Sequence, residues 1–322
     1  EVLIYIGLYM VFYGIIYALL ENDMRRLIAY SIVNQVGFML VAIGVGTELA
    51  LNGAAAHAFA HIIYKGLLIM SAGSVLMMTG KRKCTDLGGL FQTMPVTMIT
   101  CVVGALTVLA FPFTSGFATK SLETSAVAYE GLAWVWFLLL AGSVGGILHG
   151  GLKLPWFVFF HKDSGLRPSD PAPHMQYAMW FFAALCIVLG IYPEVLYNML
   201  PYPVDYQPYT VSHLVTQLQI LFFAALAFFI CLPLMSQTLT ISLDLDWVYR
   251  RLFKFIGREF TLKSNVIGHK TEMKIRGRID RVIERMHENH GPEGFLGRSW
   301  PSGSMVLWVA VLLACSLSLH YL

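Results

Sequence analysis

Residues 54–71 read AAAHAFAHIIYKGLLIMS, an apolar run that carries His57, His61 and Lys65 at intervals of four residues. An α-helix has 3.6 residues per turn, so side chains at this spacing lie on one stripe of the helix. Histidine titrates near neutral pH and lysine can also exchange a proton, so the stripe has the chemistry of a proton relay. The alternative is that the histidines only form hydrogen bonds with neighbouring helices.

The composition indicates that a membrane surrounds this stripe. Of the 322 residues, 57% are hydrophobic and 13% are charged, whereas charged residues make up about 25% of a typical soluble domain. The five cysteines form no CxxC pair, and the motifs GxxxxGK[ST], HExxH and GxSxG are absent. We therefore expect an all-α polytopic membrane protein with no metal site and no cofactor, and the titratable stripe favours a transporter with no chemistry of its own.

Eight stretches are apolar enough to predict membrane spans. Seven are continuous, at residues 2–20, 27–45, 51–78, 132–160, 175–197, 214–236 and 304–319. The fourth in chain order is irregular, with an apolar half at 96–110, a break near 111–116 and a second half at 117–129. Because unpaired backbone groups survive at membrane depth only inside protein or along a cavity, we interpret it as one discontinuous helix.

Further polar residues inside these spans are candidates for an ion pathway, because an ionisable group at mid-bilayer costs about 2.5–3.5 kcal/mol. Lys120 and Glu123 follow the break one turn apart and are expected to pair as an ion gate; the alternative is a structural ion pair. His149 and Lys153 lie in the glycine-rich fifth span, where Lys153 can alternatively reach the cytoplasmic surface. The second span adds two candidates, Asn34 and Gln35, and it carries a further polar side chain, Ser31, that is expected to face a neighbouring helix or a wet path.

The basic residues predict the orientation of the chain. If every span crosses once, all of the 22 Lys and Arg except Lys65, Lys120 and Lys153 fall in loops on one side. Basic loops stay in the cytoplasm, so this side is predicted to be cytoplasmic, in a bacterial-type inner (plasma) membrane. The net charge of +3 thus reports orientation and contact with anionic lipids, and nucleic acid is not needed to explain it.

The polar, basic stretch 243–302 is expected on the same cytoplasmic side. Within it, residues 246–260 interleave aromatic and aliphatic residues with Arg and Lys, which is typical of a helix in the headgroup layer. Residues 273–286 carry aliphatic residues at helical spacing and are expected to dock on a partner. The alternative is a solvated tether.

Several motifs resemble the antiporter-like subunits shared by respiratory complex I, membrane-bound hydrogenases and the Mrp cation/proton antiporters. They are NDMRRLIAYS at 22–31, NQVGFM at 34–39, HAFAHIIYKGLL at 57–68, AGSV at 72–75, DLGGL at 86–90 and PFTSGFATK at 112–120. The resemblance covers about residues 1–162. The basic tail and the single last span are more similar to the D-type subunit of the Mrp antiporters than to a complex I subunit.

The resemblance implies a fold and a role for the polar residues. Residues 1–162 would form the second of the family's two inverted five-helix repeats. His57, His61 and Lys65 would belong to a central hydrophilic axis, and Lys120 would be the lysine of a broken helix that leads to an outer half-channel. The family's first repeat is absent from this sequence. Since an apolar run starts at residue 2 without a basic leader, we expect the chain to be part of something longer.

These observations give an expected organisation and function. Residues 1–162 form the antiporter-like repeat, 163–242 two further spans, 243–302 the cytoplasmic or interfacial segment and 303–322 the last span. The function expected first is an ion-translocating subunit of a multisubunit Na+/proton antiporter. Its partners would be other membrane subunits, one supplying the missing repeat, with protons, Na+ and lipids. The alternatives are a proton-pumping subunit of an NADH:quinone oxidoreductase or hydrogenase complex, and a non-conducting assembly subunit.

Overall fold

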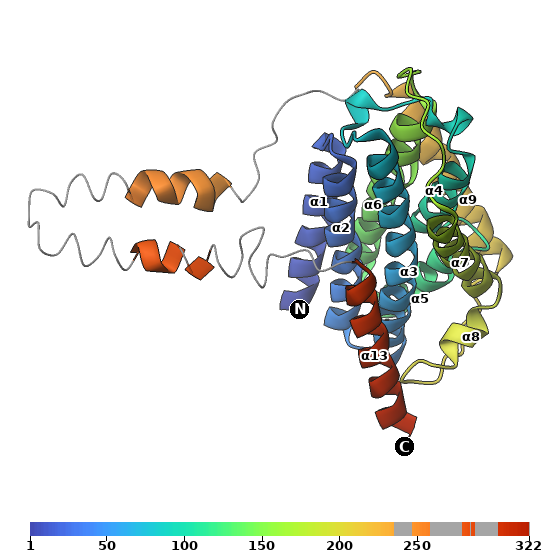
Figure 1. Cartoon of the computed structure of the whole chain (residues 1–322). Helices are drawn as coiled ribbons and strands as arrows, with labels where there is room; N and C mark the ends of the chain where they lie inside the picture. The colour runs from blue at the N-terminus through green and yellow to red at the C-terminus, as the bar shows by residue number, and fades with distance from the viewer. Residues whose placement is uncertain (235–246, 258–278, 284, 287–301, 322) are drawn as a thin grey trace, which may run out of the picture. The chain divides into compact units, whose positions relative to one another are not determined.

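The computed structural model describes residues 1–234, 247–257, 279–283, 285–286 and 302–321 (Figure 1). The chain divides into two compact units, Glu1–Ser242 and Leu243–Leu322. Regular secondary structure in the described residues is helical throughout, which confirms the predicted fold class. Of the helices predicted at 246–260 and 273–286, residues 246, 258–260, 273–278 and 284 lie outside the described ranges.

The first unit contains nine α-helices among its described residues. They are α1 (Val2–Leu20), α2 (Met24–Val45), α3 (Glu48–Thr79), α4 (Pro95–Val108), α5 (Ser115–Tyr129), α6 (Ala133–Gly146), α7 (Pro173–Ile191), α8 (Pro193–Tyr197) and α9 (Val211–Ile230). α6 continues into two π-helical segments, η3 (Ile147–Lys153) and η4 (Trp156–Phe160). The second unit contains η5 (Val248–Leu252) and α13 (Ser302–Tyr321).

Seven helical stretches of the described residues are long and apolar enough to cross a membrane. They correspond to the seven continuous spans of the prediction, and the shorter α4 together with α5 corresponds to the irregular fourth span. The chain is therefore a multi-pass membrane protein. In Figure 1, α4 lies toward the upper end of the bundle and α5 toward the lower end.

Several boundaries differ from the prediction by a few residues, and two of them have a clear local reason. α2 begins at Met24 rather than at residue 27, because the Asp23 carboxylate accepts hydrogen bonds from the backbone N–H of Arg25 (2.9 Å) and of the next residue (3.4 Å). α7 ends at Ile191 rather than at residue 197, because Pro193 has no N–H to continue the helix and instead starts the short α8.

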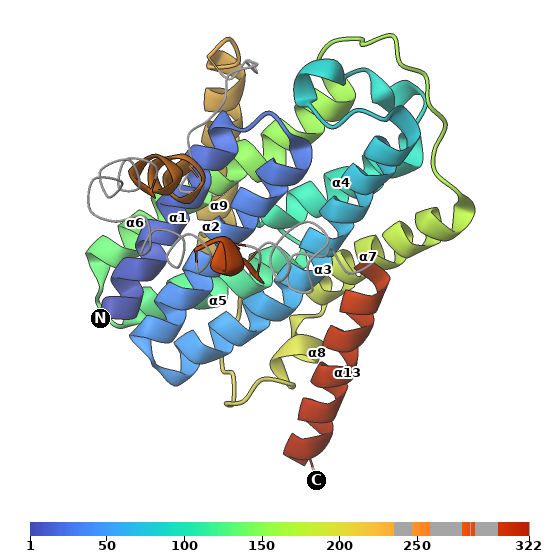
Figure 2. The ribbon, with the colours of Figure 1, turned by 60° about the vertical axis from the view of Figure 1, so that its left-hand side comes forward.

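The helices around the polar residues pack closely, and α1 and α2 lie side by side (Figures 1 and 2). A Cβ added to Gly14 of α1 would lie 2.6 Å from the backbone nitrogen of Asn34. α2 can therefore pack this closely against α1 only because residue 14 is glycine. The glycines of the fifth span act similarly, since a Cβ on Gly150 would lie 3.1 Å from the Ser31 hydroxyl. The polar residues of α2 are thereby held between α1 and the fifth span.

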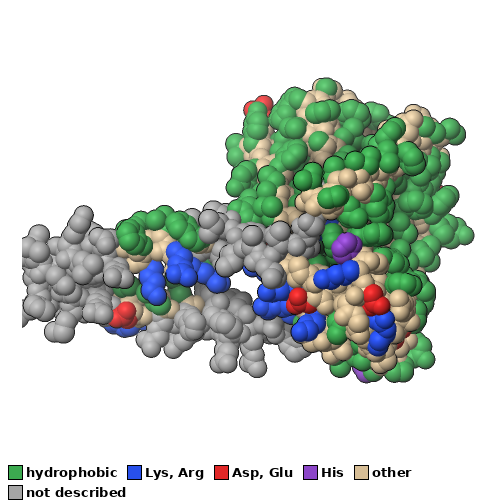
Figure 3. Space-filling model, turned by 90° about the horizontal axis from the view of Figure 1, so that it is seen from above, with side chains coloured by type: hydrophobic (Ala, Val, Ile, Leu, Met, Phe, Trp, Pro, Cys, Tyr) green, Lys and Arg blue, Asp and Glu red, His purple; other side chains and the backbone are tan. Residues whose placement is uncertain are grey.

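Charged loops of the first unit gather at one end of the bundle. Figure 3 looks onto this end and shows Lys and Arg side chains together with a few acidic ones, beside a largely hydrophobic surface. The start of α2 carries Arg25 and Arg26, and α3 is followed by the basic run 81–83. The two turns are joined by an isolated antiparallel bridge between Asp23 and Lys83. We refer to this end as the basic end.

Lys153 completes the C-terminal end of α1. Its side chain is buried, and its ammonium group donates hydrogen bonds to the main-chain oxygens of Ala18 (2.9 Å), Leu19 (2.5 Å) and Glu21 (2.8 Å). The last four C=O groups of a helix have no partner inside that helix. One lysine of the fifth span therefore supplies hydrogen bonds that α1 lacks, and it is held inside the bundle rather than reaching the surface.

Replacing Lys153 with Met, which has a similar length and no donor, should destabilise the protein. Leaving buried carbonyl groups unpaired costs roughly 1–3 kcal/mol each, so we expect the midpoint of thermal unfolding in detergent to fall by several degrees. Lys162→Met is the matched control, because Lys162 is exposed and donates one hydrogen bond, to the Thr85 carbonyl (2.6 Å). Equal midpoints for the two variants would contradict the capping role.

Candidate functional site

The three predicted ladder residues lie on the buried face of α3, a helix of 32 residues. The exposed fraction is 0% for His57, 8% for His61 and 3% for Lys65. The imidazole rings of His57 and His61 stand edge to face, with their centroids 6.1 Å apart. The stripe predicted from the spacing is therefore present, and it faces protein.

His57 contacts an acidic residue of α5. Its Nδ1 lies 2.7 Å from Glu123 Oε2, and both side chains are buried. The helices approach closely here, since a Cβ on Gly53 of α3 would lie 3.0 Å from Glu123. The predicted contact between Glu123 and Lys120 is wrong: within the described part of the chain no ion pair joins them, because the Lys120 ammonium is bound elsewhere.

Tyr64 extends this contact across α3 to α2. His57 Nε2 lies 2.9 Å from the Tyr64 hydroxyl, which donates to Gln35 Oε1 (3.3 Å). The Gln35 amide donates to Asn34 Oδ1 (2.5 Å), and the Asn34 amide donates to the Val11 carbonyl of α1 (3.1 Å). A continuous set of hydrogen bonds therefore runs from Glu123 of α5 through α3 and α2 to α1, and all five side chains that form it are buried.

The donors and acceptors of this network determine where its protons lie. The Tyr64 hydroxyl has one hydrogen, and because that hydrogen points to Gln35, His57 Nε2 must carry a proton and donate it to the Tyr64 oxygen. One further proton then lies between His57 Nδ1 and Glu123. It can sit on either side, giving an imidazolium with a carboxylate or a neutral imidazole with a carboxylic acid. The pair thus shares one transferable proton without changing its net charge.

Lys65 is held on the same helix face, further toward the basic end. Its Nζ donates to the Ser31 hydroxyl of α2 (2.5 Å). Sequence reasoning noted Ser31 as a polar residue of the second span but did not assign it to the pathway, and it missed Tyr64. The signal for Tyr64 was available, because residue 64 lies seven positions after His57 and therefore on the same face two turns later.

The predicted break in the fourth span is present, slightly earlier than expected. α4 ends at Val108 and α5 begins at Ser115. Between them Ala110 and Phe113 adopt left-handed backbone conformations, with φ of 54° and 67°. Lys120 Nζ donates a hydrogen bond to the Val108 carbonyl (2.7 Å). A lysine of α5 thereby satisfies a carbonyl group that the break leaves free at the end of α4.

A cavity of about 450 Å³ opens beside Lys120. α4 starts at the basic end and α5 continues toward Tyr129 at the opposite end, so the cavity connects Lys120 with the end that lacks the basic loops. The loop before α9 and the start of α9 also contribute residues to the cavity. The sequence did not reveal these residues, because only the fold brings them next to α5. The polar side chains along the cavity include Ser121, Thr124, Asp205, Thr210 and His213.

Some buried polar atoms near the ladder have no hydrogen-bond partner among the described protein atoms. They are His61 Nε2, Glu123 Oε1 and both ring nitrogens of His149. Buried polar groups in native proteins are as a rule paired with protein or ordered water, so these atoms mark positions suited to water or to an exchanging proton. His149 is fully buried in η3.

The predicted site residues other than His149 therefore divide into three groups. His57, Glu123, Gln35 and Asn34 share one hydrogen-bonded network, with His61 and Lys65 on the same helix face. Lys120 lies at the break, beside the cavity. Lys153 caps α1, outside the hydrogen-bonded network.

Comparison with known proteins supports the resemblance inferred from the motifs. Residues 1–148 match the family described as NADH:quinone oxidoreductase/Mrp antiporter, TM. A probable K(+)/H(+) antiporter component of Rhizobium meliloti (strain 1021) is 29% identical over 196 residues, which are 58% of this chain and 19% of that protein. The chain spans less than half the length of the first curated relatives it matches.

Two solved membrane complexes contain a chain of similar fold. The match in the Mrp complex from Dietzia sp. DQ12-45-1b has a TM-score of 0.56 and 17% identity, and covers 61% of this chain and 45% of the other. The match in the membrane-bound sulfane sulfur reductase, an archaeal respiratory membrane complex, has a TM-score of 0.61 and 21% identity, and covers 98% of this chain and 56% of the other. These similarities confirm the polytopic helical fold.

Tyr64→Phe keeps the aromatic ring and removes the hydroxyl group between His57 and Gln35. Because the change leaves buried polar atoms unpaired, we expect a loss of about 1–3 kcal/mol in the free energy of unfolding. The expected readouts are a lower thermal midpoint in detergent and shifted nitrogen NMR signals of the His57 imidazole. Tyr129→Phe is the control, because Tyr129 is 73% exposed. Unchanged imidazole signals in Tyr64→Phe would show that the network does not exist as described.

Proposed function

We propose that this chain, an antiporter-like membrane subunit whose residues 1–148 belong to the NADH:quinone oxidoreductase/Mrp antiporter family, moves protons within a multisubunit monovalent cation/proton antiporter. The observation that carries the proposal is the buried pair of His57 and Glu123, which shares a transferable proton within a hydrogen-bonded network. Na+ is the cation that we propose to be exchanged.

The degree of burial supports a transport role over a purely structural one. Lys65, Lys120 and Glu123 are each at most 4% exposed, in segments that a bundle could fill with leucine. A charged group at the bilayer centre costs about 2.5–3.5 kcal/mol on insertion scales. Groups of this kind in membrane proteins typically mark proton relays and ion paths. A helix broken beside them is the arrangement found around ion sites in transporters.

The proposed route begins in the cavity beside Lys120 and continues to Glu123, one turn further along α5. Glu123 exchanges its proton with His57 over 2.7 Å. From there the route follows the face of α3 past His61 to Lys65, in the direction of the basic end. Each group on the route can hold a proton, and the unpartnered atoms of His61 and Glu123 leave room for bridging water.

The proposed setting is a bacterial-type inner (plasma) membrane, with the basic loops and the segment 243–302 in the cytoplasm. The cavity at Lys120 would then open to the outside. We propose that other membrane subunits surround the chain and that one of them supplies the first five-helix repeat. Lipids would contact its apolar faces. Support comes from the uneven distribution of Lys and Arg and from relatives that are themselves subunits of membrane complexes.

The second candidate is a proton-pumping subunit of a redox-driven complex. The similarity to a chain of the archaeal respiratory complex favours it, because that match covers 98% of this chain. Both candidates use the same buried network. They differ in the energy source, which is a cation gradient for the antiporter and electron transfer for the redox-driven complex. Proton movement that responds to an imposed Na+ gradient without any electron donor supports the antiporter, whereas strict dependence on an electron donor supports the alternative.

Lys120 provides the test of the route. Lys120→Ala in the assembled complex should slow cation-driven proton movement in everted vesicles strongly. Lys120→Arg should fail to restore it, because arginine keeps a positive charge but does not release its proton in proteins. Lys162→Ala is the control, since Lys162 is an exposed lysine outside the network. The measurement is the quenching of a pH-sensitive dye, with the amount of assembled complex checked in parallel.

Full activity of Lys120→Arg would contradict the proton-exchange role. It would show that a fixed positive charge at the break is sufficient, so that Lys120 only caps the end of α4. Full activity of Lys120→Ala would exclude both roles.

A further inference from the structure

We propose that the groove between the start of α2 and the end of α3 is a binding site for one anionic phospholipid. The phosphate would lie among the basic side chains at the rim, and an acyl chain would lie along the apolar floor between the two helices. This inference does not depend on the proton route, which lies on the buried face of α3.

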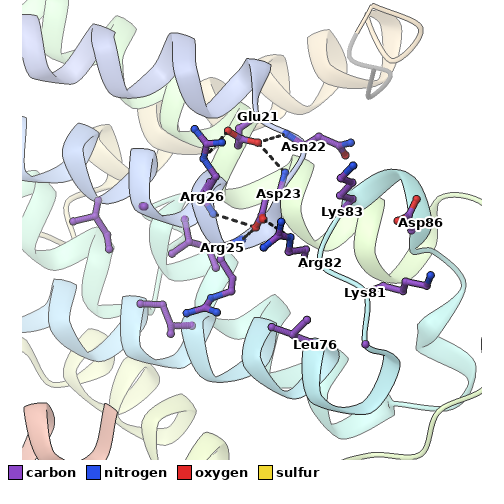
Figure 4. A pocket seen from close by; sticks show the side chains of 15 residues that line it. Glu21, Asn22, Asp23, Arg25, Arg26, Leu76, Lys81, Arg82, Lys83 and Asp86 are labelled. Atoms are coloured by element: carbon purple, nitrogen blue, oxygen red, sulfur yellow. Dashed lines mark hydrogen bonds and ion pairs between the residues drawn. The ribbon is translucent and has the colours of Figure 1, made fainter. Parts of the chain in front are cut away.

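The groove is the larger of the two cavities of the first unit described here, with a volume of about 970 Å³. Its rim is formed by the turn between α1 and α2 and by the residues that follow α3 (Figure 4). Figure 4 shows the Arg25, Arg82 and Lys81 side chains around the hollow, with Leu76 of α3 beside it. The rim therefore carries basic side chains, whereas the side of the groove formed by α3 carries the apolar Leu76.

The rim carries more positive charge than its own acidic residues neutralise. Glu21 is paired with Arg26 (3.2 Å) and Asp23 with Arg82 (3.3 Å). Asp86 is the other acidic residue of the lining. Among the described residues no ion pair involves the three remaining cations, Arg25, Lys81 and Lys83. An anionic group of two or more oxygens at this position would meet several free donors, as a phosphate requires.

The floor of the groove is apolar and extends into the membrane. It is formed by Ile28, Ala29 and Ile32 of α2 and by Ile69 and Leu76 of α3. Ile69 precedes the end of α3 by ten residues, so at 1.5 Å per residue the floor reaches about 15 Å below the rim. Ala29 and Ile69 are exposed. A soluble anion would make no contact with such a floor, whereas an acyl chain would cover it.

The rim also lies at the correct height for a lipid headgroup. At the rim, Asp23 caps the start of α2, and Gly80, with φ of 69°, ends α3. Helix ends of this kind mark the boundary between hydrocarbon and water. Basic pockets between membrane helices at that boundary are suited to anionic headgroups. Charge complementarity at the rim and the apolar floor therefore both favour an anionic phospholipid over a peptide segment of a partner.

The test measures retention of dioleoyl phosphatidylglycerol by the purified full chain, using native mass spectrometry with dioleoyl phosphatidylcholine as the neutral competitor. R25Q/K81Q should weaken one phosphatidylglycerol site on the order of thirtyfold, from the loss of two surface cations. Ala29→Trp, which fills the floor and keeps every charge, should also release the lipid. R281Q/R285Q is the matched control, with the same change of charge at two exposed residues of the second unit.

Three results would overturn the proposal. One is equal retention of the two lipids by the unaltered chain. Another is equal weakening by R25Q/K81Q and R281Q/R285Q, which would reduce the effect to net charge. The third is an unchanged Ala29→Trp variant together with displacement of the lipid by inorganic phosphate, which would make the rim a site for soluble anions.

Discussion

The contact between His57 and Glu123 is the interaction on which the arrangement of the site depends. It joins α3 to the second half of the broken helix, and it does so where a glycine of α3 lets α5 approach. One turn earlier on α5, Lys120 reaches the end of α4. The start of α5 is therefore anchored on two neighbours by side chains that can both exchange protons. The side chains that hold α5 in position are therefore also the ones that can exchange protons.

The membrane makes these contacts necessary. Backbone groups freed at a break, and titratable side chains placed at that depth, find no bulk water and must be satisfied within the protein. Lys120 and Lys153 meet this requirement in the same way, by donating to carbonyl groups at helix ends. Of the two, Lys120 also lines the cavity of about 450 Å³ described above, and Lys153 does not line it. The two lysines therefore differ in their access to this cavity rather than in their bonding.

Much of the fold and part of the site could be predicted from the sequence. Apolar length indicated the spans, the spacing of four indicated the buried stripe of α3, and Pro112 and Gly116 indicated the break. Lys120 and Glu123 were expected to pair because they lie one turn apart, but local spacing cannot show that a carbonyl of α4 and an imidazole of α3 compete for them. Tyr64 was overlooked although its spacing of seven from His57 places its hydroxyl group on the same face, because an aromatic residue in an apolar helix is usually a packing residue. Asp205 and His213 reach the cavity only through the tertiary fold.

The most direct test of the account is the rate of cation-driven proton movement in everted vesicles that contain the assembled complex with Glu123→Gln. Glutamine preserves the size of the side chain and can still contact His57, but it cannot carry the proton that the pair shares. The account predicts normal assembly and near-complete loss of proton movement. Proton movement at the unaltered rate would contradict it, and the buried pair would then only hold α3 and α5 together.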